Sequence, residues 1–175
     1  MKRFWIWAPL ALFGLFFGVV ASGLVKPSST TITSKMIGKP LPRFSLPAAH
    51  PPQPGLGSAT FAQGQPRLLN IFASWCIPCI AEAPILLDMA RRGVPIDAIA
   101  IRDRPQDVSR FLTKNGNPYQ RIGSDVDSSV QMAMGSSGVP ETFVVDGRGI
   151  IRYQHIGDIR AEDVPEIMAA LRAAR

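Results

Sequence analysis

The longest apolar run in the chain lies close to its N-terminus. Residues 4–25 contain no charged side chain and a single weakly polar one, Ser22. A helix rises about 1.5 Å per residue, so about 22 residues span the roughly 30 Å hydrocarbon core of a bilayer. Lys2 and Arg3 precede the run, and positive residues favour the cytoplasmic side of a membrane. The pattern therefore predicts one N-terminal transmembrane helix, single-pass, followed by a C-terminal part outside the cytoplasm.

A cleaved signal peptide is the alternative interpretation of this run. Small residues at 19–23 would permit cleavage, but signal peptides have apolar cores of only about 7–15 residues. The length favours an uncleaved anchor, and both interpretations export the rest of the chain. In the Ser/Thr-rich segment that follows, apolar residues show no regular spacing, which is typical of a tether. We expect a membrane anchor over residues 1–25, a tether over 26–36 and one folded domain over 37–175.

Beyond residue 36 the hydrophobic pattern alternates between short buried strands and helices. Residues 67–74 and 96–101 are short apolar runs typical of central strands. Over 77–92, apolar residues instead recur every three or four positions, as in a helix. A hairpin signal, Asp-Gly-Arg-Gly at 146–149, joins two later strands. The order of elements predicts an α/β fold with a mixed sheet flanked by helices on both faces. The other predicted elements are helices at 106–114, 128–134 and 161–173, and strands at 142–145 and 150–155.

Composition and charge change this picture little. The chain has 175 residues, of which 46% are hydrophobic, and a formal net charge of +6. The part after the anchor has the length of about one domain, which can bury an ordinary core. Its lysines and arginines are spread along the chain and form no basic tract interleaved with aromatic residues. This spacing argues against nucleic-acid binding, and the positive charge instead favours solubility and attraction to inner-membrane lipid.

The chemistry of the chain centres on its only two cysteines, Cys76 and Cys79. Two cysteines are too few for a disulfide framework, and a structural zinc site would need four ligands. The only histidines, His50 and His155, lie far apart in the chain and lack the paired spacing of zinc ligands. Ile80 follows the second cysteine, where a haem-attachment motif needs histidine. We therefore expect no metal and no bound cofactor, only a redox-active disulfide.

The position of the pair gives the two cysteines different expected roles. Cys76 falls where a predicted strand ends and a helix begins, and the unsatisfied N–H groups and helix dipole there stabilise a thiolate. The thiolate attacks disulfides, so Cys76 is the expected nucleophile. Cys79 lies one turn further on the same helical edge and can resolve a mixed disulfide. We expect Trp75 to shield the pair and Pro78 to restrict the turn, whereas a static disulfide over so short a loop would constrain the unfolded chain little.

Four further residues are candidates to support the dithiol. Glu82 lies one turn beyond the second cysteine, where a carboxylate would raise the pKa of the thiols, and a solvated helix charge is the alternative. Val139 and Pro140 precede a predicted strand. A cis bond between them would turn the Val139 backbone toward the cysteines, but an ordinary trans proline is favoured by the residues alone. For Glu141, as for Glu82, two interpretations are open: a carboxylate that acts at the site, or a solvated surface charge.

Together these segments resemble the thioredoxin superfamily and, more narrowly, the CcmG/DsbE family. The resemblance covers about residues 37–175, and the N-terminal anchor matches as well. It implies a thioredoxin-like fold in which Pro140 is cis and sits beside the dithiol. Asn70 stands where thioredoxins proper bury an aspartate, so Glu82 would handle protons instead. The resemblance rests on Leu-Leu-Asn-Ile-Phe-Ala-Ser-Trp-Cys at 68–76, Ala-Glu at 81–82, Gly-Val-Pro-Glu-Thr-Phe at 138–143, Asp-Gly-Arg-Gly-Ile-Ile-Arg-Tyr at 146–153 and Gly-Asp at 157–158.

The resemblance also implies a function for the dithiol. Proteins of this family are membrane-anchored thiol:disulfide oxidoreductases of cytochrome c maturation. It implies a reductant in the bacterial periplasm, held by the inner membrane, that keeps the haem-binding cysteines of apocytochrome c reduced. It would act on apocytochrome c directly or through its assembly partners, and a membrane thiol-disulfide transporter would supply the electrons. The alternatives are an exported disulfide reductase of broader specificity and a haem- or metal-handling chaperone that uses Cys76 and Cys79 as ligands.

Overall fold

The computed structural model describes residues 4–25 and 36–175. The chain divides into two compact units, Met1–Thr33 and Ser34–Arg175, each of which is treated by itself. The segment predicted to be a tether, 26–36, lies outside the described residues except for its last residue.

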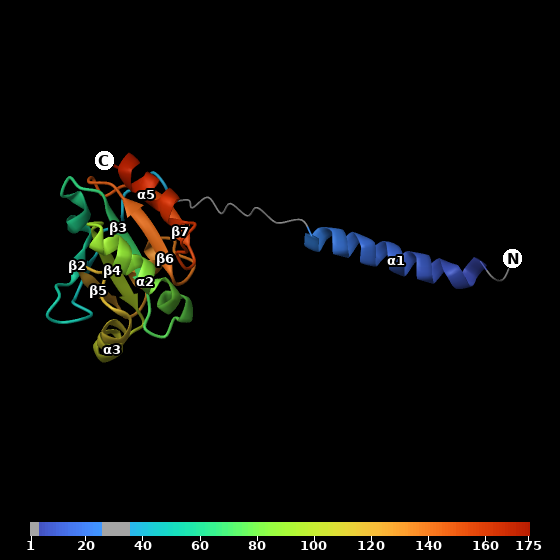
Figure 1. Ribbon diagram of the computed structural model, residues 1–175, viewed down its shortest axis with the longest axis horizontal. Helices are drawn as coiled ribbons and strands as arrows, with labels where there is room; N and C mark the ends of the chain where they lie inside the picture. The colour runs from blue at the N-terminus through green and yellow to red at the C-terminus, as the bar shows by residue number, and fades with distance from the viewer. Residues whose placement is uncertain (1–3, 26–35) are drawn as a thin grey trace. The chain divides into compact units, whose positions relative to one another are not determined.

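The first unit contains the helix α1 (Phe4–Val25), drawn in blue in Figure 1. The side chains of Leu10, Phe13 and Leu15 are 63–69% exposed on it. Among the residues that the structure describes, no helix meets the length and apolarity needed to cross a bilayer. The predicted transmembrane anchor therefore remains a prediction.

The second unit is built around five strands, which are β3 (Arg67–Phe72), β4 (Ile96–Ile101), β5 (Ile122–Asp125), β6 (Glu141–Val145) and β7 (Ile151–Ile156). They form one sheet in the order β5-β4-β3-β6-β7. Strand β4 runs parallel to β3 and β5, whereas β6 runs antiparallel to β3 and β7. The sheet is mixed, as predicted.

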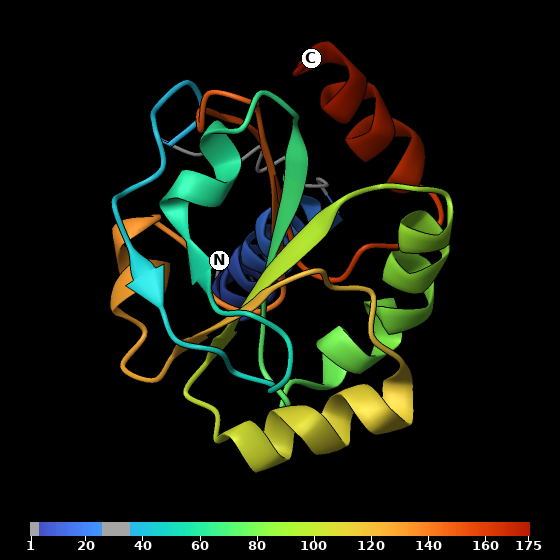
Figure 2. The same cartoon turned by 90° about the vertical axis from the view of Figure 1, so that its left-hand side faces the viewer.

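The helices of this unit are η1 (Ser58–Ala62, a 3₁₀ helix), α2 (Ile77–Arg91), α3 (Pro105–Asn115), α4 (Ser129–Ala133) and α5 (Val164–Ala173). Figure 2 shows α2 and α5 on one side of the sheet and η1 and α4 on the other. The prediction of helices on both faces is confirmed. Because both faces are covered, every residue of β3, β4 and β6 is buried.

The core extends from the sheet to helix α3 through aromatic side chains. Phe72 is fully buried at the end of β3, and its ring stacks on Tyr119 with centroids 5.1 Å apart. The ring of Phe111, on α3, lies 5.4 Å from Phe72. These contacts hold α3 beside the end of β3, where the chain turns toward the cysteines.

The hydrophobic pattern missed strand β5. Its sequence, Ile-Gly-Ser-Asp over residues 122–125, has low strand propensity. It forms because β4 offers a parallel partner, with Ala98 opposite Ile122. Gly123 also packs tightly under Leu46, whose Cβ would lie 2.9 Å from any added Cβ. Tertiary packing therefore outweighs the local preference here.

Two other regions differ in detail from the prediction. A two-stranded sheet, β1 (Ser45–Leu46) with β2 (Leu56–Gly57), is not among the strands predicted above. Helix α5 begins at Val164 and not at 161, because Pro165 lacks an N–H and fits only the first turn of a helix. The other predicted bounds agree with the structure within two residues.

The antiparallel pairing of β3 and β6 brings the two halves of the predicted site together. Strand β3 ends before the turn that carries Cys76, and β6 begins directly after Pro140. Ile71 near the end of β3 pairs with Glu141 at the start of β6. The cysteines and the proline loop therefore lie at the same end of the sheet.

Candidate active site

Cys76 and Cys79 form a disulfide at the start of helix α2. Cys76 is the N-cap residue with extended backbone, and its Sγ accepts a hydrogen bond of 3.2 Å from the backbone N–H of Cys79. Pro78 lies in the first turn, where its missing N–H leaves no hydrogen bond broken. A helix N-terminus thus faces the Cys76 sulfur, and this arrangement favours the thiolate once the disulfide is reduced.

The two cysteines are buried, but their neighbours are not. Cys76 and Cys79 are 4% and 2% exposed, whereas Trp75 is 58% exposed. Ile77, between the cysteines, is 78% exposed. Two exposed apolar side chains therefore flank Cys76, and such a surface suits contact with another protein.

The second half of the site is the loop before β6. The bond between Val139 and Pro140 is cis, as the resemblance implied, so the trans alternative is wrong. Pro140 is buried, and its carbonyl accepts a hydrogen bond of 3.0 Å from the N–H of Gly157. A second cis bond, Pro51–Pro52, was not predicted.

Glu141 is fully buried and supports this loop. Its Oε1 accepts hydrogen bonds from the backbone N–H and the hydroxyl of Ser137, at 2.8 and 2.6 Å. Its Oε2 accepts a hydrogen bond of 2.9 Å from Nε2 of Gln154 on β7. The carboxylate therefore ties the loop to the neighbouring strand, and the solvated-charge interpretation is wrong for this residue.

Glu82 is also buried, at 1% exposure, so the solvated-charge interpretation is wrong here too. Its Oε1 accepts a hydrogen bond of 3.0 Å from Asn70 Nδ2, and its Oε2 accepts one of 3.1 Å from the N–H of Ile159. Burial raises the pKa of Glu82 from 4.5 to about 7, although these two hydrogen bonds oppose the shift. A carboxyl one turn from Cys79 can therefore hold or release a proton near neutral pH.

Asn70 joins Glu82 to two residues that the sequence analysis missed. Its Nδ2 also donates to Thr142 Oγ1 at 3.0 Å, and its Oδ1 accepts a hydrogen bond of 2.8 Å from the Tyr119 hydroxyl. Burial raises the pKa of Tyr119 well above its ordinary value, so the hydroxyl stays a donor. Thr142 and Tyr119 are 72 and 49 residues away from Asn70 in sequence, and no local pattern connects them.

The comparisons with known proteins agree with this geometry. A profile of the Redoxin family matches residues 36–171. The thiol:disulfide interchange protein DsbE of Vibrio cholerae is 34% identical over 175 residues, which cover 98% of this chain and 95% of that protein. The DsbE of Pseudomonas fluorescens is 38% identical over 163 residues, covering 91% of this chain and 88% of that protein. The chain belongs to the DsbE thiol:disulfide interchange proteins. It is therefore a thiol:disulfide oxidoreductase.

Solved structures show that this DsbE-family chain has the thioredoxin-like fold. A crystal structure of a DsbE-type thiol:disulfide interchange protein from Chlorobium tepidum matches with a TM-score of 0.66, covering 79% of this chain and 96% of that chain at 23% identity. The thioredoxin domain of a thiol-disulfide oxidoreductase from Bacteroides vulgatus matches with a TM-score of 0.63, covering 78% and 97% at 19% identity. The fold expected from the resemblance is confirmed.

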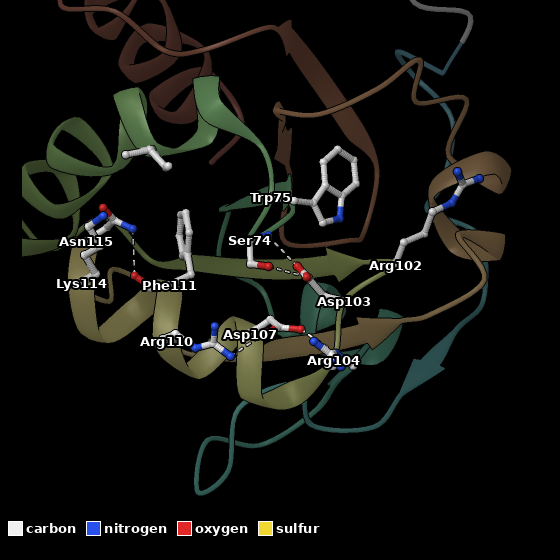
Figure 3. Close-up of a pocket in the computed structure, with 11 residues that line it drawn as sticks. Ser74, Trp75, Arg102, Asp103, Arg104, Asp107, Arg110, Phe111, Lys114 and Asn115 are labelled. Atoms are coloured by element: carbon white, nitrogen blue, oxygen red, sulfur yellow. Dashed lines mark hydrogen bonds and ion pairs between the residues drawn. The ribbon is translucent and has the colours of Figure 1, made fainter.

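Asp103 holds the turn before the dithiol of this DsbE-family chain, as Figure 3 shows. Its Oδ2 accepts a hydrogen bond of 2.6 Å from the N–H of Ser74, and its Oδ1 accepts one of 2.5 Å from the Ser74 hydroxyl. Asp103 was not among the residues predicted from the sequence. A usable signal was present, since Asp103 follows the carboxyl end of a buried parallel strand, where functional side chains gather in α/β sheets.

The histidines considered as zinc ligands make other contacts. The His50 ring lies 2.8 Å from the Ser109 hydroxyl, and the His155 ring lies 3.3 Å from the Asp158 carbonyl. Within residues 4–25 and 36–175, no group of three or more His, Cys, Asp or Glu side chains is placed to hold a metal ion.

Proposed function

We propose that this protein is a disulfide reductase of cytochrome c maturation, exported from the cytoplasm and held at the bacterial inner membrane. The observation that carries the proposal is the buried Glu82 one turn beyond Cys79. A carboxylate near a dithiol disfavours the thiolate. Strongly oxidising dithiol proteins instead have a stabilised reduced form, so destabilising the thiolate favours reductant chemistry.

The reaction begins with the reduced dithiol. The Cys76 thiolate attacks one sulfur of a client disulfide, the client S–S bond breaks, and one client cysteine leaves as a thiolate that takes up a proton. Cys79 then loses its proton and attacks Cys76 Sγ, which releases the second client thiol. Two electrons pass from the dithiol to the client, and the Cys76–Cys79 disulfide re-forms.

The supporting residues have distinct roles in this proposal. The buried Glu82 accepts the proton from Cys79 during the second step, because a carboxyl with a pKa of about 7 can take up a proton near neutral pH. The backbone of Val139, before the cis Pro140, pairs with the extended chain of the client. Trp75 shields the mixed disulfide, and Pro78 restricts the turn between the cysteines. Glu141 keeps the proline loop in place.

The proposed location follows from the N-terminal sequence. Residues 4–25 are uncharged and lie within one helix, α1, and Lys2 and Arg3 precede them. By the positive-inside rule, this helix would place the redox domain in the periplasm and contact inner-membrane lipid. A cleaved signal peptide would give the same compartment without the anchor.

The proposed partners follow from the family. The clients are apocytochrome c or its assembly partners, whose haem-binding cysteines must be reduced before haem is attached. A membrane thiol-disulfide transporter supplies the two electrons that return the Cys76–Cys79 disulfide to the dithiol. An exported reductase of broader specificity would share this chemistry and differ only in its clients.

Trapping the mixed disulfide tests the proposal. In Cys79→Ser, the Cys76 thiolate can attack but nothing resolves the product, so covalent complexes with apocytochrome c or its assembly partners should accumulate on non-reducing gels. Cys76→Ser is the matched control and should trap none. If Cys79→Ser captured many exported proteins without preference, the broader reductase would replace the cytochrome c assignment.

A further inference from the structure

A hollow of about 640 Å³ lies beside the dithiol, between the start of α2 and helix α3. We call it the α2–α3 groove. Trp75, which directly precedes Cys76, and Ile80, which directly follows Cys79, line it. These two side chains are 58% and 41% exposed, and Phe111 of α3 adds a third apolar side chain to the lining. The residues that flank the two cysteines therefore line one part of the groove.

The opposite wall of the groove is basic. Arg104 and Arg110, 80% and 77% exposed at their side chains, line it together with Lys114 at the end of α3 (Figure 3). With Arg102, the lining contains four cationic side chains against two carboxylates, those of Asp103 and Asp107, which leaves an excess of two positive charges.

Both carboxylates in the groove already have partners. Asp103 binds Ser74, as described above. Asp107 accepts hydrogen bonds of 2.7 Å from Arg104 Nε and 2.9 Å from Arg110 Nη2, and hydrogen bonding to Arg104 lowers the pKa of Asp107. A guanidinium has five N–H donors, so each arginine can still bind a second carboxylate.

We propose that the α2–α3 groove binds the residues that flank the reacting cysteine of a partner protein and that it favours acidic flanking residues. The inference rests on the thiol exchange of the proposed function. In a mixed disulfide with Cys76, the partner chain lies next to Trp75, and the part of it that does not pair with Val139 can cross the surface toward α3. An extended chain advances about 3.3 Å per residue, so a few residues bring it onto α3. Carboxylates there meet Arg110 and Lys114.

Peptide disulfides test this preference with the full-length chain in detergent. Two peptides with one internal disulfide are identical except that glutamates flank the cysteines in one and glutamines in the other. At low salt, we expect the reduced protein to react about fivefold faster with the glutamate peptide, because charges at the edge of an interface act mainly on the association rate. The preference should shrink as salt screens these charges.

Two charge reversals localise the effect. Arg110→Glu should abolish the preference for the glutamate peptide. Arg91→Glu is the matched control, because Arg91 is also exposed on a helix and also lies three residues after an aspartate, Asp88. If Arg91→Glu lost the preference equally, the net charge of the protein would explain it and the groove would not.

The remaining outcomes separate this inference from the proposed function. Equal rates with both peptides would overturn the proposed preference of the groove for acidic residues, but they would not contradict disulfide exchange. Failure to reduce either peptide would contradict the exchange itself. A second copy of this chain is the other possible occupant, so a dimer at low salt that Arg110→Glu dissociates in sedimentation would also overturn the proposal.

Discussion

The side chain of Asn70 connects three separate parts of the fold. It donates to Glu82 on α2 and to Thr142 on β6, and it accepts from Tyr119 between α3 and β5. These contacts determine which way the amide points, because a flipped amide would place its oxygen against the Glu82 carboxylate oxygen, and both atoms are acceptors. Its donor therefore faces the Glu82 carboxyl, whose ionisation is the residue-scale property with the clearest consequence.

Glu82 makes stability depend on pH in a way that one variant should remove. Its folded pKa of about 7 lies above its ordinary 4.5, so the folded state keeps a proton that the unfolded chain has released. The free energy of unfolding should therefore fall as pH rises through this window, by about 3 kcal/mol in total. Glu82→Gln cannot titrate, so its stability relative to the natural protein should rise by about that amount between pH 4 and pH 8.

Urea unfolding of the oxidised protein at pH 4 and pH 8 measures this difference. Glu162→Gln, at an exposed position, is the control for losing a carboxylate. A difference between Glu82→Gln and the natural protein that stays constant over this range would contradict a raised pKa for Glu82.

At the scale of elements, the ends of α2 and α3 determine how the two helices pack. Gly93, just beyond α2, and Gly116, which ends α3, both have a positive φ, of +85° and +86°. Around Gly93 an added Cβ would meet nothing within 4 Å, whereas at Gly116 it would lie 2.5 Å from Leu87 Cδ1 on α2. The two glycines therefore share a positive φ but differ in their surroundings, and Gly116, with a ψ of 165°, lies outside the left-handed helical region.

Alanine at these two positions should cost different amounts of stability. Gly93→Ala should cost about 1 kcal/mol, since alanine disfavours left-handed backbone. Gly116→Ala should cost about 1 kcal/mol more, because Leu87 must also move. Denaturant unfolding measures both, and the part of the extra cost that comes from contact with Leu87 should disappear in a Leu87→Ala background. Equal costs for the two alanines would show that α2 and α3 are not in close contact there.

At the scale of the whole molecule, the hydrophobic core of the redox domain lies within one unit. The buried apolar side chains of this core extend from Leu41 to Ala174, and Met36 packs against them. Among the residues that the structure describes, none from α1 belongs to this cluster. Folding and disulfide exchange should therefore depend on residues 36–175, and membrane attachment on the residues before them.

Removing residues 1–35 tests this division. The truncated protein should keep the melting temperature and the disulfide-exchange rate of the full-length chain, because its core is intact. It should no longer sediment with membranes, whereas the full-length chain should. A large drop in melting temperature would show that the N-terminal residues stabilise the domain.

Much of this protein follows from its sequence alone. The hydrophobic patterns that mark buried strands and amphipathic helices extend over only a few neighbouring residues. The bounds of β3, β4, α2 and α3 were therefore predicted within two residues. The Cys-x-x-Cys spacing at a strand-to-helix junction is also local, so the position of Cys76 at the helix start could be predicted. The segment 138–143 resembled its family closely enough to imply the cis Pro140.

Only the tertiary structure decided the surroundings of these residues. The sequence did not decide whether the carboxylates of Glu82 and Glu141 are buried or solvated, because burial depends on which distant segments pack over a side chain. Strand β5 likewise forms only because β4 lies beside it. The raised pKa of Glu82 is a property of its burial and of partners such as Asn70 and Ile159, so it exists only once segments far apart in the chain have come together.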